Sequence, residues 1–214
     1  MNSKVDERFE TQVIDVCQVY HDAPQWAKQL VRVVSTDEMT GVQALERKAP
    51  DLTMTPGQAV RREVEYIRHG TLCFIVSRDV ATGQVIVRRR STFPVQEFFR
   101  FLYHVEQHYP QASIIYIALD NWPVHFHDYV LNNLARIQSK IRLLRLPTYA
   151  PWTNPIEKFW LKLNREFMNQ HPYGRDEAAF RDALDLWLDK HREESEALLH
   201  EVGLLPDAWK GVPD

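Results

Sequence analysis

Residues 113–119 form an almost wholly apolar run, which constrains the fold more than any other segment of the chain. A short run of this kind is typical of a central β-strand that is covered on both faces. A second run, at residues 30–35, is rich in β-branched side chains and predicts another core strand. Two such strands require a sheet with helices packed on both of its faces.

The other patterns predict an alternation of strands and helices. Apolar runs at residues 72–76 and 85–87 flank a turn at residues 81–84, which predicts an antiparallel hairpin. Thr92 is predicted to cap a helix that is entered at Pro94. Further expected segments are helices at residues 10–20 (ended by Pro24), 124–137 and 176–201, a strand at residues 141–146, and a long loop or insertion at residues 41–70. This order predicts a mixed α/β sheet in which the hairpin is antiparallel and the later crossovers are parallel.

The composition is that of an ordinary globular protein, with 44% hydrophobic and 26% charged residues among 214. No apolar run approaches the roughly 18 residues of a membrane span, and the polar N-terminus lacks the apolar core of a signal peptide. The two cysteines exclude a disulfide framework and a four-cysteine zinc site. A cytoplasmic protein without a membrane partner is therefore expected.

Three acidic residues stand on three separate short motifs. Asp37 and Asp120 follow the two core-strand runs, and Glu157 opens an amphipathic helix. Carboxylates at the ends of neighbouring strands, facing a helix N-terminus, could converge on divalent cations. Taken singly, an Asp after a strand is more often a turn former or a helix cap.

Glu157 has a structural alternative of its own. Residues 154–157 fit the pattern of an N-cap followed by the first three helical positions. On this pattern Glu157 closes a capping box onto the backbone of Asn154. The capping role and the metal role compete for the same carboxylate oxygens.

His125 and His127 form an H-x-H pair. In a helix these side chains lie about 200° apart, so they cannot share a metal ion in the manner of an i, i+4 pair. His125 stands five residues after Asp120 and could reach the same cleft.

A net charge of −3 provides no general attraction to a polyanion, so any contact with nucleic acid requires a local basic patch or another domain. Lys158, Lys162 and Arg165 recur at helical spacing after Glu157 and form either a solvated face or a phosphate-binding stripe. Other positive charges flank the hairpin: Arg61, Arg62, Arg68, His69 and Arg88 to Arg90.

Four motifs together resemble the catalytic domain of a DDE transposase. They are Ser-Thr-Asp-Glu at residues 35–38, Glu-Tyr-Ile-Arg-His-Gly-Thr at 65–71, Asp120-Asn121 with His125, and Leu-Pro-Thr-Tyr-Ala-Pro-Trp-Thr-Asn-Pro-Ile-Glu at 146–157. The resemblance spans about residues 31–167 and is closest to the bacterial insertion-sequence branch of the mariner superfamily. The 36 residues between Asp120 and Glu157 agree with that family.

The resemblance implies a ribonuclease-H-like fold and metal-dependent DNA strand cleavage and strand transfer. Asp37, Asp120 and Glu157 would hold two Mg²⁺ or Mn²⁺ ions, with Asp37 bridging them. The implied partners are transposon ends and target DNA, a second copy of the chain in a homodimer, and the nucleoid when DNA is bound. Candidate DNA contacts are Arg68, His69, His125, Lys158, Lys162 and Arg165.

The resemblance also suggests three parts: residues 1–28 as an N-terminal helix and linker, 29–170 as the catalytic domain, and 171–214 as a helical extension packed on it. Relatives carry helix-turn-helix DNA-binding modules before the catalytic domain, but only about 30 residues precede the first strand here. The chain therefore resembles a catalytic half alone, from a truncated element or from the second of two reading frames, and a separate DNA-binding transposase subunit is one candidate partner. Three alternatives remain open: a ribonuclease-H-like nuclease that does not join strands, a non-catalytic remnant that binds DNA or transposase, and a self-associating structural module.

Overall fold

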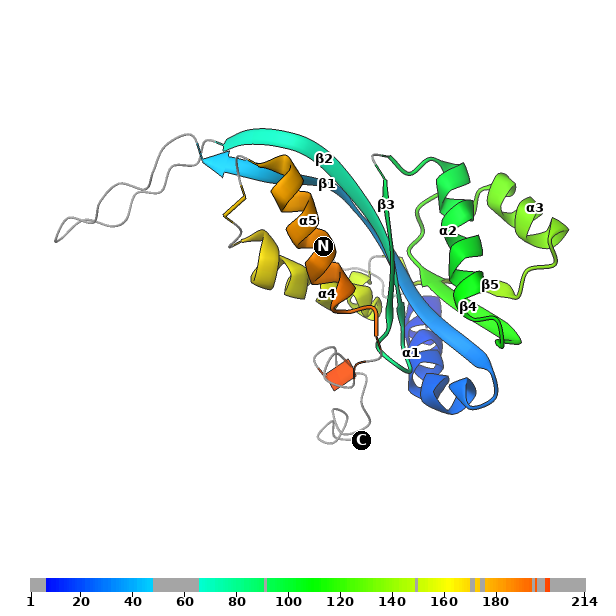
Figure 1. Cartoon of the computed structure of the whole chain (residues 1–214). Coiled ribbons are helices and arrows are strands. Elements are labelled where there is room, and N and C mark those ends of the chain that lie inside the picture. Colours follow the sequence, from blue (N-terminus) through cyan, green and yellow to red (C-terminus); the bar gives the residue numbers. More distant parts are fainter. Residues whose placement is uncertain are drawn as a thin grey trace.

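The computed structural model describes residues 7–47, 66–90, 92–148, 150–169, 172–173, 176–193, 195 and 199–200, with side chains from 9–42 and from 72 onward within these ranges. The elements follow one another along the chain as shown in Figure 1. They are α1 (Glu7–Ala27), β1 (Val31–Arg47), β2 (Tyr66–Asp79), β3 (Val85–Arg90), α2 (Val95–His108), β4 (Ile114–Leu119), α3 (Asp128–Arg136), β5 (Ile141–Arg145), the 3₁₀ turn η1 (Pro151–Thr153), α4 (Ile156–Leu163), the π-helical turn η2 (Asn164–Met168) and α5 (Glu177–Asp189). Among these described helices, none is both long and apolar enough to cross a membrane.

The described strands form one five-stranded sheet in the order β3-β2-β1-β4-β5. β1 pairs with β2, and β2 with β3, in antiparallel fashion, whereas β1 pairs with β4, and β4 with β5, in parallel. The predicted mixed sheet, with an antiparallel hairpin followed by parallel crossovers, is confirmed.

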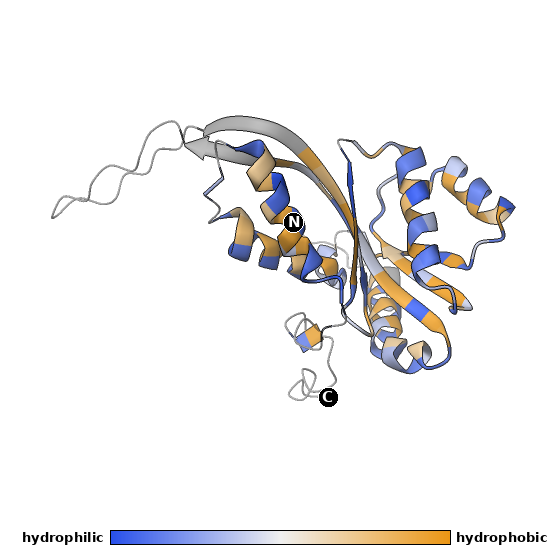
Figure 2. Cartoon of the chain, in the orientation of Figure 1, coloured by the Kyte–Doolittle hydropathy of each residue, from blue (hydrophilic) through white to orange (hydrophobic). Residues whose placement is uncertain are grey.

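Helices cover both faces of the sheet, as the apolar strands predicted (Figure 1). Strand alternation sends successive side chains of β1 to opposite faces, so Val33 packs under α1 while Val34 packs under α2. On the face of Val33, α4 and α5 bury Phe159 and Phe180 against β2. The strands are mainly hydrophobic where the helices enclose them, and the helices carry hydrophilic residues outward (Figure 2).

β1 is much longer than the sequence pattern predicted. Its parallel pairing with β4 ends at Ser35 and Ala118, but its antiparallel pairing with β2 continues to Arg47. Asp37 therefore lies within a strand, at the level where β4 has already ended. Irregular pairing around Val42 breaks the two-residue alternation that a strand usually shows. The predicted loop at residues 41–70 is therefore wrong at both ends, where residues 41–47 belong to β1 and residues 66–70 to β2. Residues 48–65 lie outside the described part of the chain.

Several predicted helix boundaries were also wrong. α1 continues through Pro24, because Ala23 and Trp26 pack against the sheet and this burial outweighs the missing proline N–H. α2 has Pro94 as its N-cap without a side-chain hydrogen bond, so Thr92 does not cap it. α3 begins only at Asp128, after a turn, and α5 ends at Asp189.

The three arginines at the end of β3 alternate between the two faces of the sheet. Arg88 and Arg90 pair with Glu97 of α2 at 3.4 and 3.1 Å, whereas Arg89 pairs with Asp185 of α5 at 2.6 Å. These ion pairs join the edge strand to a helix on each face.

Candidate active site

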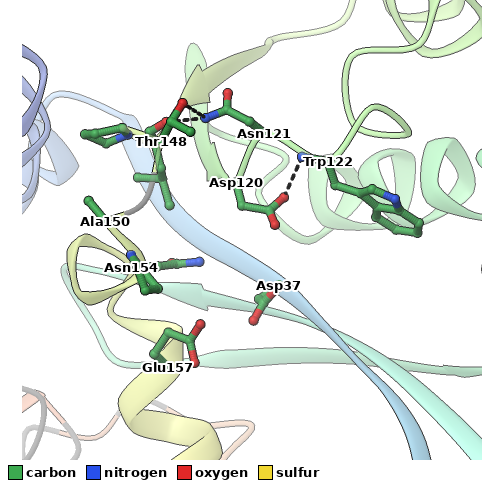
Figure 3. A pocket seen from close by; sticks show the side chains of 11 residues that line it. Asp37, Asp120, Asn121, Trp122, Thr148, Ala150, Asn154 and Glu157 are labelled. Atoms are coloured by element: carbon green, nitrogen blue, oxygen red, sulfur yellow. Dashed lines mark hydrogen bonds between the residues drawn. The ribbon is translucent and has the colours of Figure 1, made fainter. Parts of the chain in front are cut away.

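Asp37, Asp120 and Glu157 line a single cleft of about 290 Å³ at the carboxyl end of β4. Figure 3 shows the three carboxylates around one common space, with Asp37 from β1, Asp120 from the end of β4 and Glu157 from α4. The remaining lining residues are Asn121, Trp122, Leu146, Pro147, Thr148, Ala150, Pro151 and Asn154. The three motifs that carry the predicted acids thus meet in the folded chain.

Asp37 is held from the side of α4. Its Oδ2 accepts a hydrogen bond of 2.9 Å from the indole Nε1 of Trp160. Burial is the main cause that raises the pKa of Asp37 to about 7, and the charges of Glu38 and Glu157 add to the rise. The hydrogen bond from Trp160 opposes it. The surrounding protein therefore stabilises the ionised form of Asp37 less than water does.

Asp120 is held from the opposite side of the cleft. Its Oδ1 lies 2.9 Å from Nδ1 of His125 and accepts a 3.0 Å hydrogen bond from the backbone N–H of Trp122. The hydrogen bond from His125 is the main cause that lowers the pKa of Asp120. Its side chain remains 58% exposed, so the carboxylate is open to the cleft.

Asn154 positions the helix that carries Glu157. Its Oδ1 accepts a hydrogen bond from Oγ of Ser35, and its Nδ2 donates to the carbonyl of Thr36 at 3.4 Å. Ser35 Oγ also accepts the backbone N–H of Ile156 at 3.1 Å. The start of α4 is therefore hydrogen-bonded to β1, directly beside Asp37.

The predicted capping box at Glu157 is wrong. The N-cap of α4 is Pro155, and no side chain caps the helix, because Asn154 is occupied by its contacts with β1. The carboxylate of Glu157 is instead directed to the cleft (Figure 3). Burial, together with the charge of Asp120, raises the pKa of Glu157.

The donor set of the cleft suits a hard divalent cation. Its three carboxylates supply oxygen atoms, which are the ligands that Mg²⁺ and Mn²⁺ prefer. The charge of Glu157 helps to raise the pKa of Asp37, and the charge of Asp120 helps to raise that of Glu157, a repulsion that a cation would relieve. Among the described residues, no group of three or more Asp, Glu, His or Cys side chains is already close enough to hold a metal ion.

His125 is fully buried, which does not suit the predicted contact with DNA. Its Nδ1 faces Asp120, and its Nε2 lies 3.0 and 3.1 Å from the two carboxylate oxygens of Glu38. Burial alone would lower the pKa of His125, but the two carboxylates outweigh it and raise that pKa to about 9. His127 is the N-cap of α3 and accepts the N–H of Tyr129, so the two histidines do not share a helix.

The predicted basic stripe follows the site along α4 and η2. Lys158 is exposed on α4. Lys162 pairs with Glu166 at 2.7 Å, and Arg165 reaches the same carboxylate at 3.4 Å. Arg68 and His69 lie in β2 opposite β1, but their side chains, like Arg61 and Arg62, are outside the described part of the structure.

Sequence reasoning missed Glu38, Trp160 and Asn154 as parts of the site. A signal was present for Glu38, because a second carboxylate next to Asp37 in an apolar strand needs a partner. For Trp160 and Asn154 the partners stand more than a hundred residues away, in β1.

Comparison with solved structures places the fold among transposase catalytic domains. The chain matches the Mos1 transposase paired-end complex with left transposon end with a TM-score of 0.67 at 17% identity, covering 98% of this chain and 62% of that chain. It matches the Mos1 mariner paired end complex with Mn with a TM-score of 0.65 at 17% identity, covering 97% and 62%. It matches the catalytic domain of Mos1 mariner transposase with a TM-score of 0.60 at 15% identity, covering 98% and 94%.

The chain spans about three fifths of the length of the Mos1 chains in the paired-end complexes. At these identities the likeness concerns the fold, and it confirms the predicted ribonuclease-H-like sheet. No curated protein matches the chain. Residues 32–179 match the family described as DDE superfamily endonuclease. The matched range includes all three acids of the cleft. The chain therefore belongs to the DDE superfamily endonucleases, as its motifs predicted.

Proposed function

We propose that this chain is a transposase catalytic domain that cleaves DNA strands and joins them to new ones. The observation that carries the proposal is the convergence of Asp37, Asp120 and Glu157 on one cleft. Membership of the DDE endonuclease family and the fold shared with the Mos1 catalytic domain support it. A narrower place in the bacterial insertion-sequence branch stays a prediction.

The three carboxylates would hold Mg²⁺ or Mn²⁺, as two ions. Bound there, the ions would activate a water or a 3′-hydroxyl as nucleophile and stabilise the leaving 3′-oxygen. Trp160 holds Asp37 and His125 holds Asp120, so two of the three ligands are oriented before DNA arrives. Asn154 sets the position of Glu157 relative to them. Structures of Mos1 with Mn and with Mg support this choice of cations.

The DNA backbone would be held by local basic groups, because the net charge of the chain is −3. Lys158 and Lys162 of α4 and Arg165 of η2 follow Glu157 along the chain. Lys162 and Arg165 both reach the carboxylate of Glu166, at 2.7 and 3.4 Å. Arg68 and His69 of β2 stay candidates from the sequence.

The proposed partners are transposon ends and target DNA. The Mos1 structures include a complex with the left transposon end and a strand transfer complex, which supports this class of substrate. A homodimer and a separate DNA-binding subunit are part of the same proposal.

The test is Mg²⁺- or Mn²⁺-dependent nicking of a labelled DNA duplex at low salt. Wild type would be compared with Asp120→Asn and Glu157→Gln, and with Asp182→Asn, which removes an exposed acid of α5. We expect cleavage to be lost in the first two variants and kept in the third. Equal cleavage in all four proteins would overturn the proposal.

A strand-joining assay then separates a transposase from a nuclease with the same fold. The substrate is a duplex with a pre-formed 3′-hydroxyl end, offered together with a target plasmid. Joined product that requires Asp37, Asp120 and Glu157 supports strand transfer. Hydrolysis without joining would favour the ribonuclease-H-like nuclease, and saturable DNA binding without any cleavage would favour a non-catalytic remnant.

A further inference from the structure

We propose that Glu38 and His125 form a buried pair that positions the Asp120 carboxylate for its cation. This inference rests on the proposed function, because it assigns an outer hydrogen-bond partner to one of the proposed metal ligands. Neither residue lines the cleft. Both act through Asp120, as positioning residues.

The geometry of His125 determines which oxygen of Asp120 is held. Nδ1 lies 2.9 Å from Oδ1 of Asp120, and Nε2 lies 3.0 Å from Oε1 of Glu38. Since both ring nitrogens face carboxylate oxygens, both must donate, and the ring has only one satisfactory orientation. The N–H of Trp122 also binds Oδ1 of Asp120. Oδ2 is thereby the oxygen left to the cleft.

Asp120 needs such a partner more than Asp37 does. It follows the last residue of β4 and its side chain is 58% exposed, so the strand itself does not restrain the carboxylate. His125 supplies the restraint from a buried position. Its ring packs against Phe98 with a centroid separation of 4.7 Å and against Trp122 at 5.4 Å.

The alternation of β1 explains how one strand serves both sides of the site. Asp37 turns towards Trp160 of α4, on the face where Val76 opposite it packs with α4. Glu38 therefore turns to the other face, where Ile75 opposite it packs with α2. From that face Glu38 reaches His125 in the loop between β4 and α3. Of these two adjacent acids of β1, Asp37 lines the cleft, whereas Glu38 acts on it through His125 and Asp120.

A purely structural reading of the same contacts is that Glu38 and His125 form a buried ion pair that only stabilises the fold. The two readings differ in one measurable respect. A positioning role lowers the affinity for the cation in protein that is fully folded. Outer partners of metal ligands typically contribute about 10- to 100-fold in metal affinity or activity. A structural role lowers only the amount of folded protein.

The test is Mn²⁺ binding to the full chain without DNA, measured by the electron paramagnetic resonance signal of free Mn²⁺. We expect His125→Asn to weaken binding by about 10- to 100-fold. Glu38→Gln preserves the size of the side chain and one acceptor for His125, so it should weaken binding in the same direction but less. In both variants a high Mn²⁺ concentration should restore the DNA cleavage rate, which loss of folded protein would not allow.

Glu106→Gln is the matched control. Glu106 is a part-buried carboxylate that binds Ser139 and the N–H of Lys140, away from the cleft, so its loss should leave Mn²⁺ affinity unchanged. One outcome would overturn the role of the pair and leave the proposed function standing. In that outcome His125→Asn and Glu38→Gln bind Mn²⁺ with wild-type affinity, while Asp120→Asn loses binding. If Asp120→Asn binds Mn²⁺ as wild type does, both proposals fail.

Discussion

Trp160 donates its indole N–H to Oδ2 of Asp37 across 2.9 Å and thereby ties α4 to the middle of β1. The bond partly offsets the burial that raises the pKa of Asp37. One residue of α4 thus orients a proposed metal ligand that lies on a different element. The same helix carries Glu157, so two of the three carboxylates depend on how α4 is seated.

Trp160→Phe is expected to weaken Mn²⁺ binding by about tenfold, in the lower part of the range seen for outer partners of metal ligands. The lost hydrogen bond to a carboxylate should also cost about 1.5–3 kcal/mol of unfolding free energy. Mn²⁺ titration and urea denaturation measure the two effects. Trp187→Phe is the control, because Trp187 donates its indole N–H to Glu166 at 3.3 Å, outside the cleft. Equal Mn²⁺ affinities in the two variants would contradict the assigned role.

Asp37→Asn is expected to stabilise the metal-free protein at neutral and alkaline pH. Burial raises the pKa of Asp37 from 3.8 to about 7, so within this window the folded state holds a proton that the unfolded state has released. The stability of wild type should therefore fall as the pH rises from about 4 to about 7. Asp37→Asn does not show this loss of stability. Above pH 7 its free energy of unfolding should exceed that of wild type by at most about 4 kcal/mol.

Urea denaturation in the presence of a chelator, across this pH range, measures the difference between wild type and Asp37→Asn. Asp182→Asn should follow the pH dependence of wild type, because Asp182 is exposed on α5. A difference between wild type and Asp37→Asn that stays constant from pH 4 to 8 would show that Asp37 does not titrate in this window.

Mn²⁺ affinity is expected to rise with pH and to level off above about pH 7. A cation binds the deprotonated carboxylate, so below the pKa of Asp37, which is about 7, each binding event must release a proton. The apparent affinity should therefore change by about tenfold per pH unit on the acid side. Calorimetry in buffers of different ionisation enthalpy counts the released protons. If Mn²⁺ binds at about pH 6 without releasing a proton, protonation of Asp37 is not what limits the Mn²⁺ affinity.

Asn154→Ala is expected to reduce cleavage at every metal concentration. The substitution removes the acceptor for Ser35 and leaves buried polar groups of β1 without their partner, at a cost of about 1–3 kcal/mol. Glu157 then loses its fixed position relative to Asp37. Thermal unfolding and single-turnover nicking check the two effects. Asn133→Ala, which also loses an amide hydrogen bond to the backbone but on α3, should retain the wild-type cleavage rate.

The architecture was largely predictable from the sequence, because strand and helix patterns depend on neighbouring residues. The apolar run at residues 113–119 identified the central strand β4, and the patterns around residue 81 identified the β2–β3 hairpin. The errors fell at element ends. β1 extends beyond its apolar run because β2 pairs with it as far as Arg47, and no local pattern reports that partner.

The sequence by itself determined the family and the three acids, since their motifs occur in family order around Asp37, Asp120 and Glu157. Only the tertiary structure decided what holds these acids. Ser35 meets Asn154, and Glu38 meets His125, across 119 and 87 positions of the chain. Which of two adjacent acids faces the cleft depends on the helices that cover each face of the sheet. That choice is made by packing between distant segments, which a local pattern of residues does not encode.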